Sequence, residues 1–274
     1  MTASGTAARA GDSDALQALA RVGLAAYGVV HLLVAWLALE LAWGGGRGSA
    51  DQSGALATLV GQPSGKPLLW VVAIGLFALA LWQLAELLRL RTAPRDSGKD
   101  RSKAAFKAAK TIGTAVVYLA LGWSAARFAT GSGGSSAGQQ QQAVSGVLGW
   151  PGGRFWVVVA AAVLVGIGVY HVHKGLTRGF LDDIDTASAS PAATRTVERV
   201  GLVGFPAKGV ALVLVGVLFA WAAFSFDPAR ASGLDGAMRT VLSAPAGQWL
   251  LTLVALGIVA FGAFLLLRAR YPQR

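Results

Sequence analysis

Few side chains in this sequence could take part in acid–base or ligand chemistry, and most of them lie in or beside long apolar stretches. His31 stands inside the first stretch, about 15 Å along a helix from the stretch's beginning. A histidine at such depth could relay a proton or bind a ligand. It could also be a neutral histidine bonded to a neighbouring helix, and this interpretation is favoured because Tyr118 holds the corresponding place later in the chain.

Two further ionisable residues stand near the far ends of apolar stretches. Glu40 follows His31 by nine residues, which at about 100° per residue places the two side chains on opposite faces of one helix. An intrahelical relay between them is therefore excluded. Glu40 is expected at the membrane interface, or paired with Arg127 at the corresponding end of the third stretch.

Two histidines near the end of the fourth stretch raise the question of a haem or metal site. His31 lies about 10 Å deeper than His171, whereas axial ligands of one haem must lie at similar depth. His171 and His173 are two residues apart and point in different directions. Both are expected to be interfacial polar residues. Gln83 and Glu86 share one face of the second stretch and are expected to cap the bundle rather than line a vestibule.

The motifs of conventional enzymes are missing from the sequence. It has no cysteine, which excludes disulfides, thiolate catalysis and cysteine-ligated metals. No Walker, GxSxG, HExxH or GxGxxG pattern stands in a usable context. We therefore expect no catalytic residue, no bound metal and no cofactor, and a protein that is not an enzyme.

The elements that position these side chains are apolar blocks. Hydrophobic residues make up 54% of the chain and charged residues 14%, against about 25% charged residues in soluble domains. Six blocks are long enough to cross a bilayer as helices, and most tryptophans lie near their ends, as in an interfacial aromatic belt. The sequence predicts an all-α integral membrane protein with apolar blocks at 22–43, 67–88, 111–130, 154–173, 205–226 and 249–267.

The charges flanking these blocks predict the orientation. Eighteen Lys and Arg residues fall on the side that holds both termini, including Lys208, and six on the other. The positive-inside rule places both termini in the cytoplasm. Lysine makes up only 7 of the 24 basic residues and alanine is frequent, which is typical of a GC-rich bacterial genome, so we expect the chain in a bacterial plasma membrane. The net charge of +11 is thus explained by topology and not by nucleic acid. The basic loop 89–110 also resembles a segment that binds anionic lipid.

An internal repeat links the blocks. The segments that follow the first, third and fifth blocks share alanine, apolar residues at +1, +4 and +5, proline at +8 and glycine at +10. Apolar residues at +1, +4 and +5 lie on one face of a helix, so each segment is predicted to form a short amphipathic helix on the extracytoplasmic side. The proline ends this helix before the chain re-enters the membrane. The repeat therefore predicts three tandem two-helix hairpins, defined by Pro63 and Gly65, Pro151 and Gly153, and Pro245 and Gly247.

The repeats also divide the chain into segments. The predicted segments are a polar cytoplasmic N-terminus (1–20), repeat 1 (21–91), a basic linker (92–106), repeat 2 (107–178), a second linker (179–198), repeat 3 (199–271) and a tail (272–274).

A family resemblance rests on the repeated residues. The pattern Gly28-Val29-Val30-His31, the later PxG and the GxY of the fourth span at Gly168 and Tyr170 resemble the domain of unknown function 1206 family. Its members are small bacterial, often actinobacterial, membrane proteins with three such repeats. The resemblance implies the fold and implies no activity. Family members often have an arginine before the first glycine, where this chain has Tyr27, Thr114 and Lys208.

Three functions are compatible with the sequence. The scarcity of buried charge favours a non-enzymatic scaffold or accessory subunit, with a membrane-protein partner or a second copy of itself. The alternative is a transporter or channel for a small molecule, an ion or protons, with His31, Tyr118 and Lys208 along its pathway. The second alternative is a lipid-binding protein, whose partner would be the bilayer, with anionic lipid at the basic loops.

Overall fold

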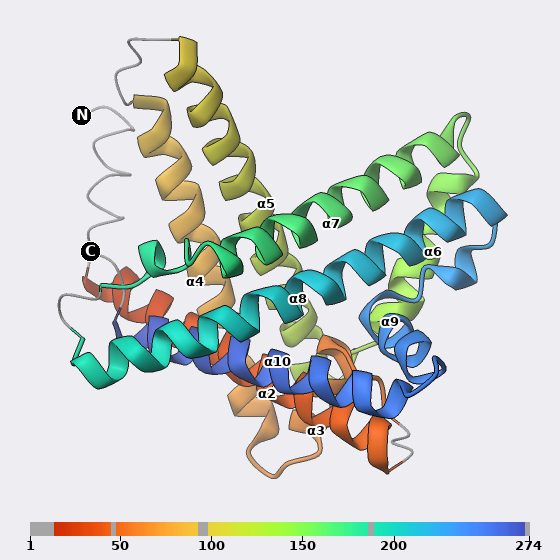
Figure 1. The fold of residues 1–274 in the computed structure, drawn as a ribbon, viewed down its shortest axis with the longest axis horizontal. Helices are drawn as coiled ribbons and strands as arrows, with labels where there is room; N and C mark the ends of the chain where they lie inside the picture. Colours follow the sequence, from red (N-terminus) through yellow and green to blue (C-terminus); the bar gives the residue numbers. More distant parts are fainter. Residues whose placement is uncertain (1–13, 45–47, 93–97, 186–188, 272–274) are drawn as a thin grey trace. The chain divides into compact units, whose positions relative to one another are not determined.

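A computed structural model of the chain describes residues 14–44, 48–92, 98–185 and 189–271. This described part consists of helices and short connections, with no strand (Figure 1). The α-helices are α2 (Asp14–Trp43), α3 (Gln52–Val60), α4 (Gly65–Thr92), α5 (Gly98–Ala129), α6 (Ser136–Leu148), α7 (Gly153–Leu176), α8 (Pro191–Ser225), α9 (Gly233–Leu242) and α10 (Gly247–Arg270). Two short 3₁₀ helices, η1 (Leu181–Asp183) and η2 (Pro228–Arg230), lie in the connections.

Six of the helices are long and apolar enough to cross a membrane. The spans are Arg21–Trp43, Gly65–Ala85, Lys107–Ala129, Gly153–Leu176, Pro191–Ser225 and Gly247–Arg270. Each contains most or all of one predicted apolar block, so the prediction of an all-α chain with six apolar helices is confirmed, and these helices fit a multi-pass membrane protein. Helices α3, α6 and α9, here called the connecting helices, join the two spans of each repeat.

Two spans continue as helix into the segments expected to be linkers. Helix α5 begins at Gly98 and α8 at Pro191. The added turns of α8 have a regular start, since the Ser190 hydroxyl accepts a hydrogen bond from Ala193 N at 3.2 Å and proline occupies the first helical position. The predicted tail 272–274 and residues 1–13 of the predicted N-terminal segment lie outside the described residues.

The PxG motif forms the same turn in all three repeats. The glycine amide donates to the carbonyl three residues earlier, with N···O distances of 2.9 Å for Gly65 to Gln62, 2.9 Å for Gly153 to Trp150 and 2.8 Å for Gly247 to Ala244. A side chain on any of these glycines would collide with a carbonyl of the preceding connecting helix, namely that of Leu59, Val147 or Leu242. Each glycine is also the first residue of the returning span, so the motif fixes where the chain re-enters the bundle.

The connecting helices bury the apolar stripe that the repeat predicts. Leu56, Val144 and Met238 stand at +1 of the three copies and are 2%, 5% and 2% exposed. Val144 packs with Val157 at the start of α7 and with Ala222 near the end of α8. These amphipathic helices therefore cover protein with their apolar faces.

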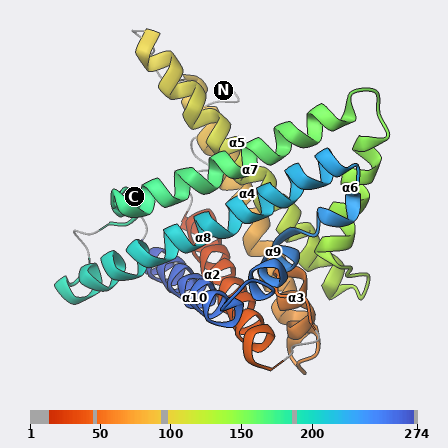
Figure 2. The ribbon, with the colours of Figure 1, turned by 45° about the vertical axis from the view of Figure 1, so that its right-hand side comes forward.

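The described chain divides into two compact units. Unit 1 comprises residues 1–27 and 59–133, and unit 2 comprises residues 28–58 and 134–274. In unit 1, α4 packs against α5. In unit 2, α7 runs beside α8, and α8 packs against α10 and α9 (Figures 1 and 2).

Glycines let neighbouring repeats approach closely in unit 2. A Cβ on Gly168 of α7 would lie 2.6 Å from the Gly209 oxygen of α8. A Cβ on Gly28 of α2 would lie 3.0 Å from the Gly262 oxygen of α10. By the register of the repeat these are equivalent contacts between the second span of one copy and the first span of another. Small residues at such contacts allow helix backbones to touch in a membrane.

Unit 1 has small residues at the equivalent positions. Ala80 of α4 corresponds to Gly168 and Gly262, and Ala115 of α5 corresponds to Gly28 and Gly209. Both alanines are buried, with exposed fractions of 0% and 3%. The position therefore demands a small, buried residue in every copy.

Candidate functional site

Phe261 of α10 is the point in unit 2 where two sequence-predicted polar residues meet. The Nζ atom of Lys208, on α8, lies 4.1 Å from the centre of the Phe261 ring. The His31 ring, on α2, has its centre 5.1 Å from that of Phe261, with the two planes inclined by 55°. His31 is 7% exposed and Phe261 3%. Ionisable residues of repeats 1 and 3 thus share one buried aromatic ring.

Backbone contacts hold the three helices at this point. Gly262, the next residue after Phe261, makes the close approach to Gly28 on α2. A Cβ on Gly204 of α8 would lie 2.5 Å from the Phe261 nitrogen. Because α2 and α8 both touch α10 within one residue of Phe261, the positions of His31 and Lys208 follow from helix packing.

Phenylalanines fill the neighbouring core of unit 2. Phe205 of α8 lies 5.2 Å from Phe261, 4.9 Å from Phe264 and 5.4 Å from Phe180, measured between ring centres. Phe180 and Phe264 are 0% exposed. Aromatic pairs at these separations add stability beyond the area they bury. The polar pair on Phe261 therefore adjoins a close-packed aromatic core.

Polar side chains also flank this aromatic core. The His171 ring stacks on Phe205 with 5.9 Å between ring centres, and its Nδ1 atom lies 2.8 Å from the Ile167 oxygen. Lys174 also lies beside Phe205, with its Nζ atom 5.4 Å from the centre of that ring, and it forms an ion pair with Asp183. His171 is thus held by a ring and a carbonyl, and His173 is exposed.

Tyr118 lies in unit 1, where it contacts Tyr27. The two rings meet edge to face, with 5.7 Å between centres, and each residue is 8% exposed. In the register of the repeat, Tyr27 corresponds to Lys208 and Tyr118 corresponds to His31. The same two positions of the first spans therefore carry a tyrosine pair in unit 1 and an ionisable pair in unit 2.

The other predicted polar residues have the following surroundings within their own units. The guanidinium of Arg127, in unit 1, donates from Nη2 to the Ser132 oxygen at 2.9 Å and from Nε at 3.2 Å. It therefore caps the end of α5. Glu40, in unit 2, is exposed. Gln83 is half-buried on α4, and the side chain of Glu86 lies outside the described residues.

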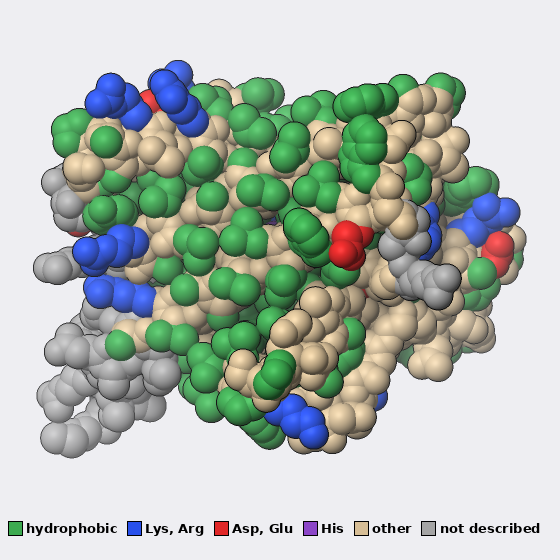
Figure 3. Space-filling view, turned by 90° about the horizontal axis from the view of Figure 1, so that it is seen from below, with side chains coloured by type: hydrophobic (Ala, Val, Ile, Leu, Met, Phe, Trp, Pro, Cys, Tyr) green, Lys and Arg blue, Asp and Glu red, His purple; other side chains and the backbone are tan. Residues whose placement is uncertain are grey.

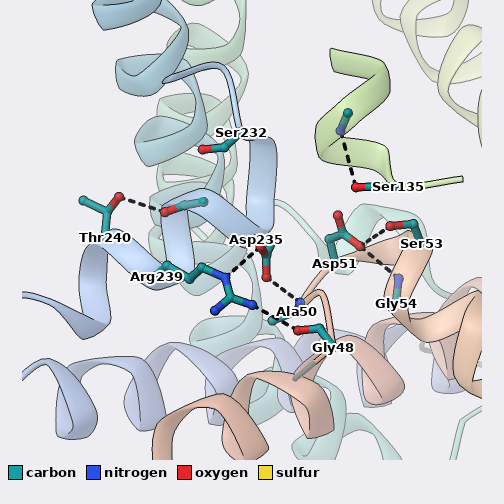
Figure 4. Close-up of polar contacts among 12 residues, drawn as sticks. Gly48, Ala50, Asp51, Ser53, Gly54, Ser135, Ser232, Asp235, Arg239 and Thr240 are labelled. Atoms are coloured by element: carbon teal, nitrogen blue, oxygen red, sulfur yellow. Dashed lines mark hydrogen bonds and ion pairs between the residues drawn. The ribbon is translucent and has the colours of Figure 1, made fainter. Parts of the chain in front are cut away.

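A polar network among the connecting helices is a feature that the sequence analysis missed. Asp235 of α9 accepts from the Ala50 amide at 2.8 Å and from Arg239 Nε at 2.9 Å. Arg239 also donates to the Gly48 oxygen at 3.1 Å (Figure 4). These contacts, here called the clasp, join α9 of repeat 3 to the loop before α3 of repeat 1.

A second part of this network joins repeats 1 and 2 at the start of α3. Asp51 caps α3, since its Oδ1 atom accepts from the Ser53 hydroxyl at 2.6 Å and from the Gly54 amide at 3.0 Å. Ser53 Oγ in turn accepts from the amide of Ser136, the first residue of α6, at 3.1 Å. Asp51 followed by Ser53 and Gly54 is a helix-start signal that was readable in the sequence. The contacts with α6 and α9 could not be read from the sequence.

The described residues offer no cluster for a metal ion. None of the described parts of the chain brings three or more His, Asp or Glu side chains together in a way that could hold one.

Comparison with known proteins places the chain in a family. The family described as Domain of Unknown Function (DUF1206) matches residues 22–86, 109–178 and 203–272. "Uncharacterized protein YxxB" of Bacillus subtilis (strain 168) is similar, with 27% identity over 256 residues, which cover 92% of this chain and 90% of the relative. No solved structure matches the chain. The three matched segments coincide with the three hairpins, and the chain belongs to the DUF1206 family.

Proposed function

We propose that the protein is a non-enzymatic scaffold or accessory subunit of a bacterial plasma membrane. The observation that carries the proposal is the packing of unit 2, where glycine contacts join α7 to α8 and α10 to α2, and phenylalanines fill the space beside them. Helices with touching backbones and interlocked rings have few alternative arrangements. Such a unit suits a protein that offers fixed surfaces to its neighbours.

The exposed side of α7 is a surface that this function could use. Val163 is 54% exposed and Phe155 63% exposed, whereas Ala161 and Val157 on the other side of the helix are 2% and 3% exposed. Lipid chains cover such a face in an isolated protein. In a scaffold, part of it would meet a helix of a membrane-protein partner or of a second copy.

A crosslinking experiment in growing cells tests the scaffold proposal. A photo-reactive amino acid at Val163 should give a protein adduct of one defined mass, and the same residue at the buried Ala161 should give none. Adducts to lipid alone at Val163, at Phe155 and at the exposed Trp156 would contradict the proposal. A companion test places the purified protein in liposomes, where a scaffold moves neither ions nor protons.

The orientation of the scaffold follows from its charges. We infer that both termini and the ends of α7 and α10 near Lys174 and Arg268 face the cytoplasm, and that the connecting helices face outward. The 18-to-6 distribution of basic residues supports this orientation. A cysteine introduced at the exposed Thr240 of α9 should react with a membrane-impermeant maleimide in intact cells, and one at the exposed Arg270 should not.

A transporter or channel for ions or protons is the second candidate. Its support is the meeting of His31 and Lys208 on Phe261, because ionisable residues inside spans often mark transport pathways. Proteoliposomes with an imposed pH gradient should then dissipate the gradient, and His31→Leu should abolish the flux. His173→Leu, at an exposed position, is the matched control. Equal rates in protein-containing and empty liposomes would remove this candidate.

Lipid binding is a third candidate, supported by the distribution of surface side chains. Figure 3 shows a face covered by hydrophobic side chains, with Lys and Arg towards its margins. Exposed basic residues near the ends of spans, such as Arg195 and Arg270, suit anionic headgroups. Native mass spectrometry should find retained anionic lipid, and Arg195→Gln with Arg270→Gln should reduce it.

A further inference from the structure

Positions 27 and 31 of α2 and their counterparts in α5 and α8 include two tyrosines in unit 1 and two ionisable side chains in unit 2. In unit 1 the residue at the first position of repeat 1, Tyr27, touches the residue at the second position of repeat 2, Tyr118. In unit 2 the first position of repeat 3 is Lys208 and the second position of repeat 1 is His31, and both lie on Phe261. Lys208 and His31 thus share the ring of Phe261, at the positions of the repeat where Tyr27 and Tyr118 touch each other.

We propose that Lys208 and His31 form an intramembrane proton-binding pair, in which one proton moves between the lysine Nζ atom and a ring nitrogen of the histidine. An ammonium group beside a neutral imidazole becomes an amine beside an imidazolium, so the pair carries one positive charge in both forms. Removal of the shared proton leaves a neutral amine and a neutral imidazole. The ring of Phe261 faces the positive charge, as in other cation–π contacts.

The surroundings suit a shared proton more than two independent charges. His31 is 7% exposed and Phe261 3%, so water has little access to the imidazole, and a second positive charge beside Lys208 would be expensive in a membrane interior. Two groups that share a proton titrate as a pair. The site goes beyond the scaffold function, since a scaffold could hold or release a proton without moving a solute.

Other titratable groups on the packed helices are placed differently. On α10, Arg268 stands seven residues after Phe261 and carries a fixed positive charge. On α7, His171 stacks on Phe205 and Lys174 pairs with Asp183. On α2, Tyr27 lies one turn before His31 and contacts Tyr118. His171 has a ring and a carbonyl as its neighbours, and it serves as the control for the test below.

Nitrogen-15 NMR of the full-length protein in lipid nanodiscs tests the pair. Lysine and histidine are labelled, and the signals of Lys208 and His31 are identified by their loss in Lys208→Met and His31→Gln. We expect both signals to change over one pH interval in the unaltered protein. In His31→Gln the titration midpoint of Lys208 should move by about one pH unit or more, and in His171→Gln it should stay in place.

Two results would overturn the proposal. One is a Lys208 midpoint that is the same in the unaltered protein and in His31→Gln, which would show that the groups titrate independently. The other is a Lys208 signal that does not change between about pH 5 and about pH 10. If His31→Gln does not fold, the His31 signal in Lys208→Met gives the same comparison from the other partner. These readouts report proton binding alone, so they are separate from the crosslinking and flux tests of function.

Discussion

The Tyr27–Tyr118 contact of unit 1 and the His31–Phe261–Lys208 group of unit 2 occupy equivalent positions of the repeat but differ in chemistry. The backbone around them is copied closely, with small residues at Ala80 and Ala115 in one unit and glycines at the matching places in the other. The polar side chains are not copied. Helix packing is thus the property that the repeats share, and of these two equivalent places only the one in unit 2 carries ionisable side chains.

The largest expected effect comes from breaking the shared packing. Gly209→Leu places a side chain against the Gly168 oxygen of α7, so α7 and α8 must separate. Overpacking of this kind should lower the free energy of unfolding by about 3 kcal/mol, measured by denaturant titration in lipid bicelles. Gly166→Leu on α7 is the matched control, because a Cβ there meets nothing within 4 Å. Equal losses in the two variants would show that α7 and α8 do not depend on the glycine contact.

A smaller loss of stability should distinguish the His31–Phe261–Lys208 group from the Tyr27–Tyr118 contact. Phe261→Leu removes the ring that Lys208 and His31 share, together with the contacts to Phe205 and Phe264. We expect a loss of about 2 kcal/mol in the free energy of unfolding. Tyr118→Leu removes one edge-to-face contact and should cost about 1 kcal/mol. The ordering of the two losses is the test, and Phe224→Leu, at a site that is 61% exposed, controls for the loss of a ring.

The clasp offers a third comparison, because only repeat 3 has the aspartate. Asp235 aligns with Ser53 and Gln141, and it alone accepts from both Ala50 N and Arg239. Asp235→Asn should weaken the charge-assisted bonds and cost about 1 kcal/mol. Asp182→Asn removes an equal charge at an exposed site and should change the stability little. A loss of equal size at Asp182 would mean that net charge, and not the clasp, is responsible.

The sequence was sufficient for the features that depend on local pattern. Apolar length predicts the six spans, and the proline and glycine spacing predicts the connecting helices and their PxG turns. The sequence also indicated His31 and Lys208 as candidate site residues, because ionisable residues in apolar stretches are rare. Phe261 and Asp235 carried no such signal. A phenylalanine in a span and an aspartate in a polar helix are ordinary, and their roles arise only when distant segments pack together.

The smallest expected effect concerns a residue that differs between otherwise identical turns. Ala246 has a φ of 57° and Gly152, its counterpart in repeat 2, has a φ of 73°. Glycine adopts this left-handed conformation without the steric penalty that a Cβ imposes, which is about 1 kcal/mol. Ala246→Gly should therefore raise the free energy of unfolding by somewhat less than about 1 kcal/mol, since glycine also loses more entropy on folding. Gly152→Ala should lower it by a similar amount. If the two changes shift the stability in the same direction, the PxG turns of repeats 2 and 3 are not equivalent. The repeats would then share the geometry of their spans and not that of the turns between them.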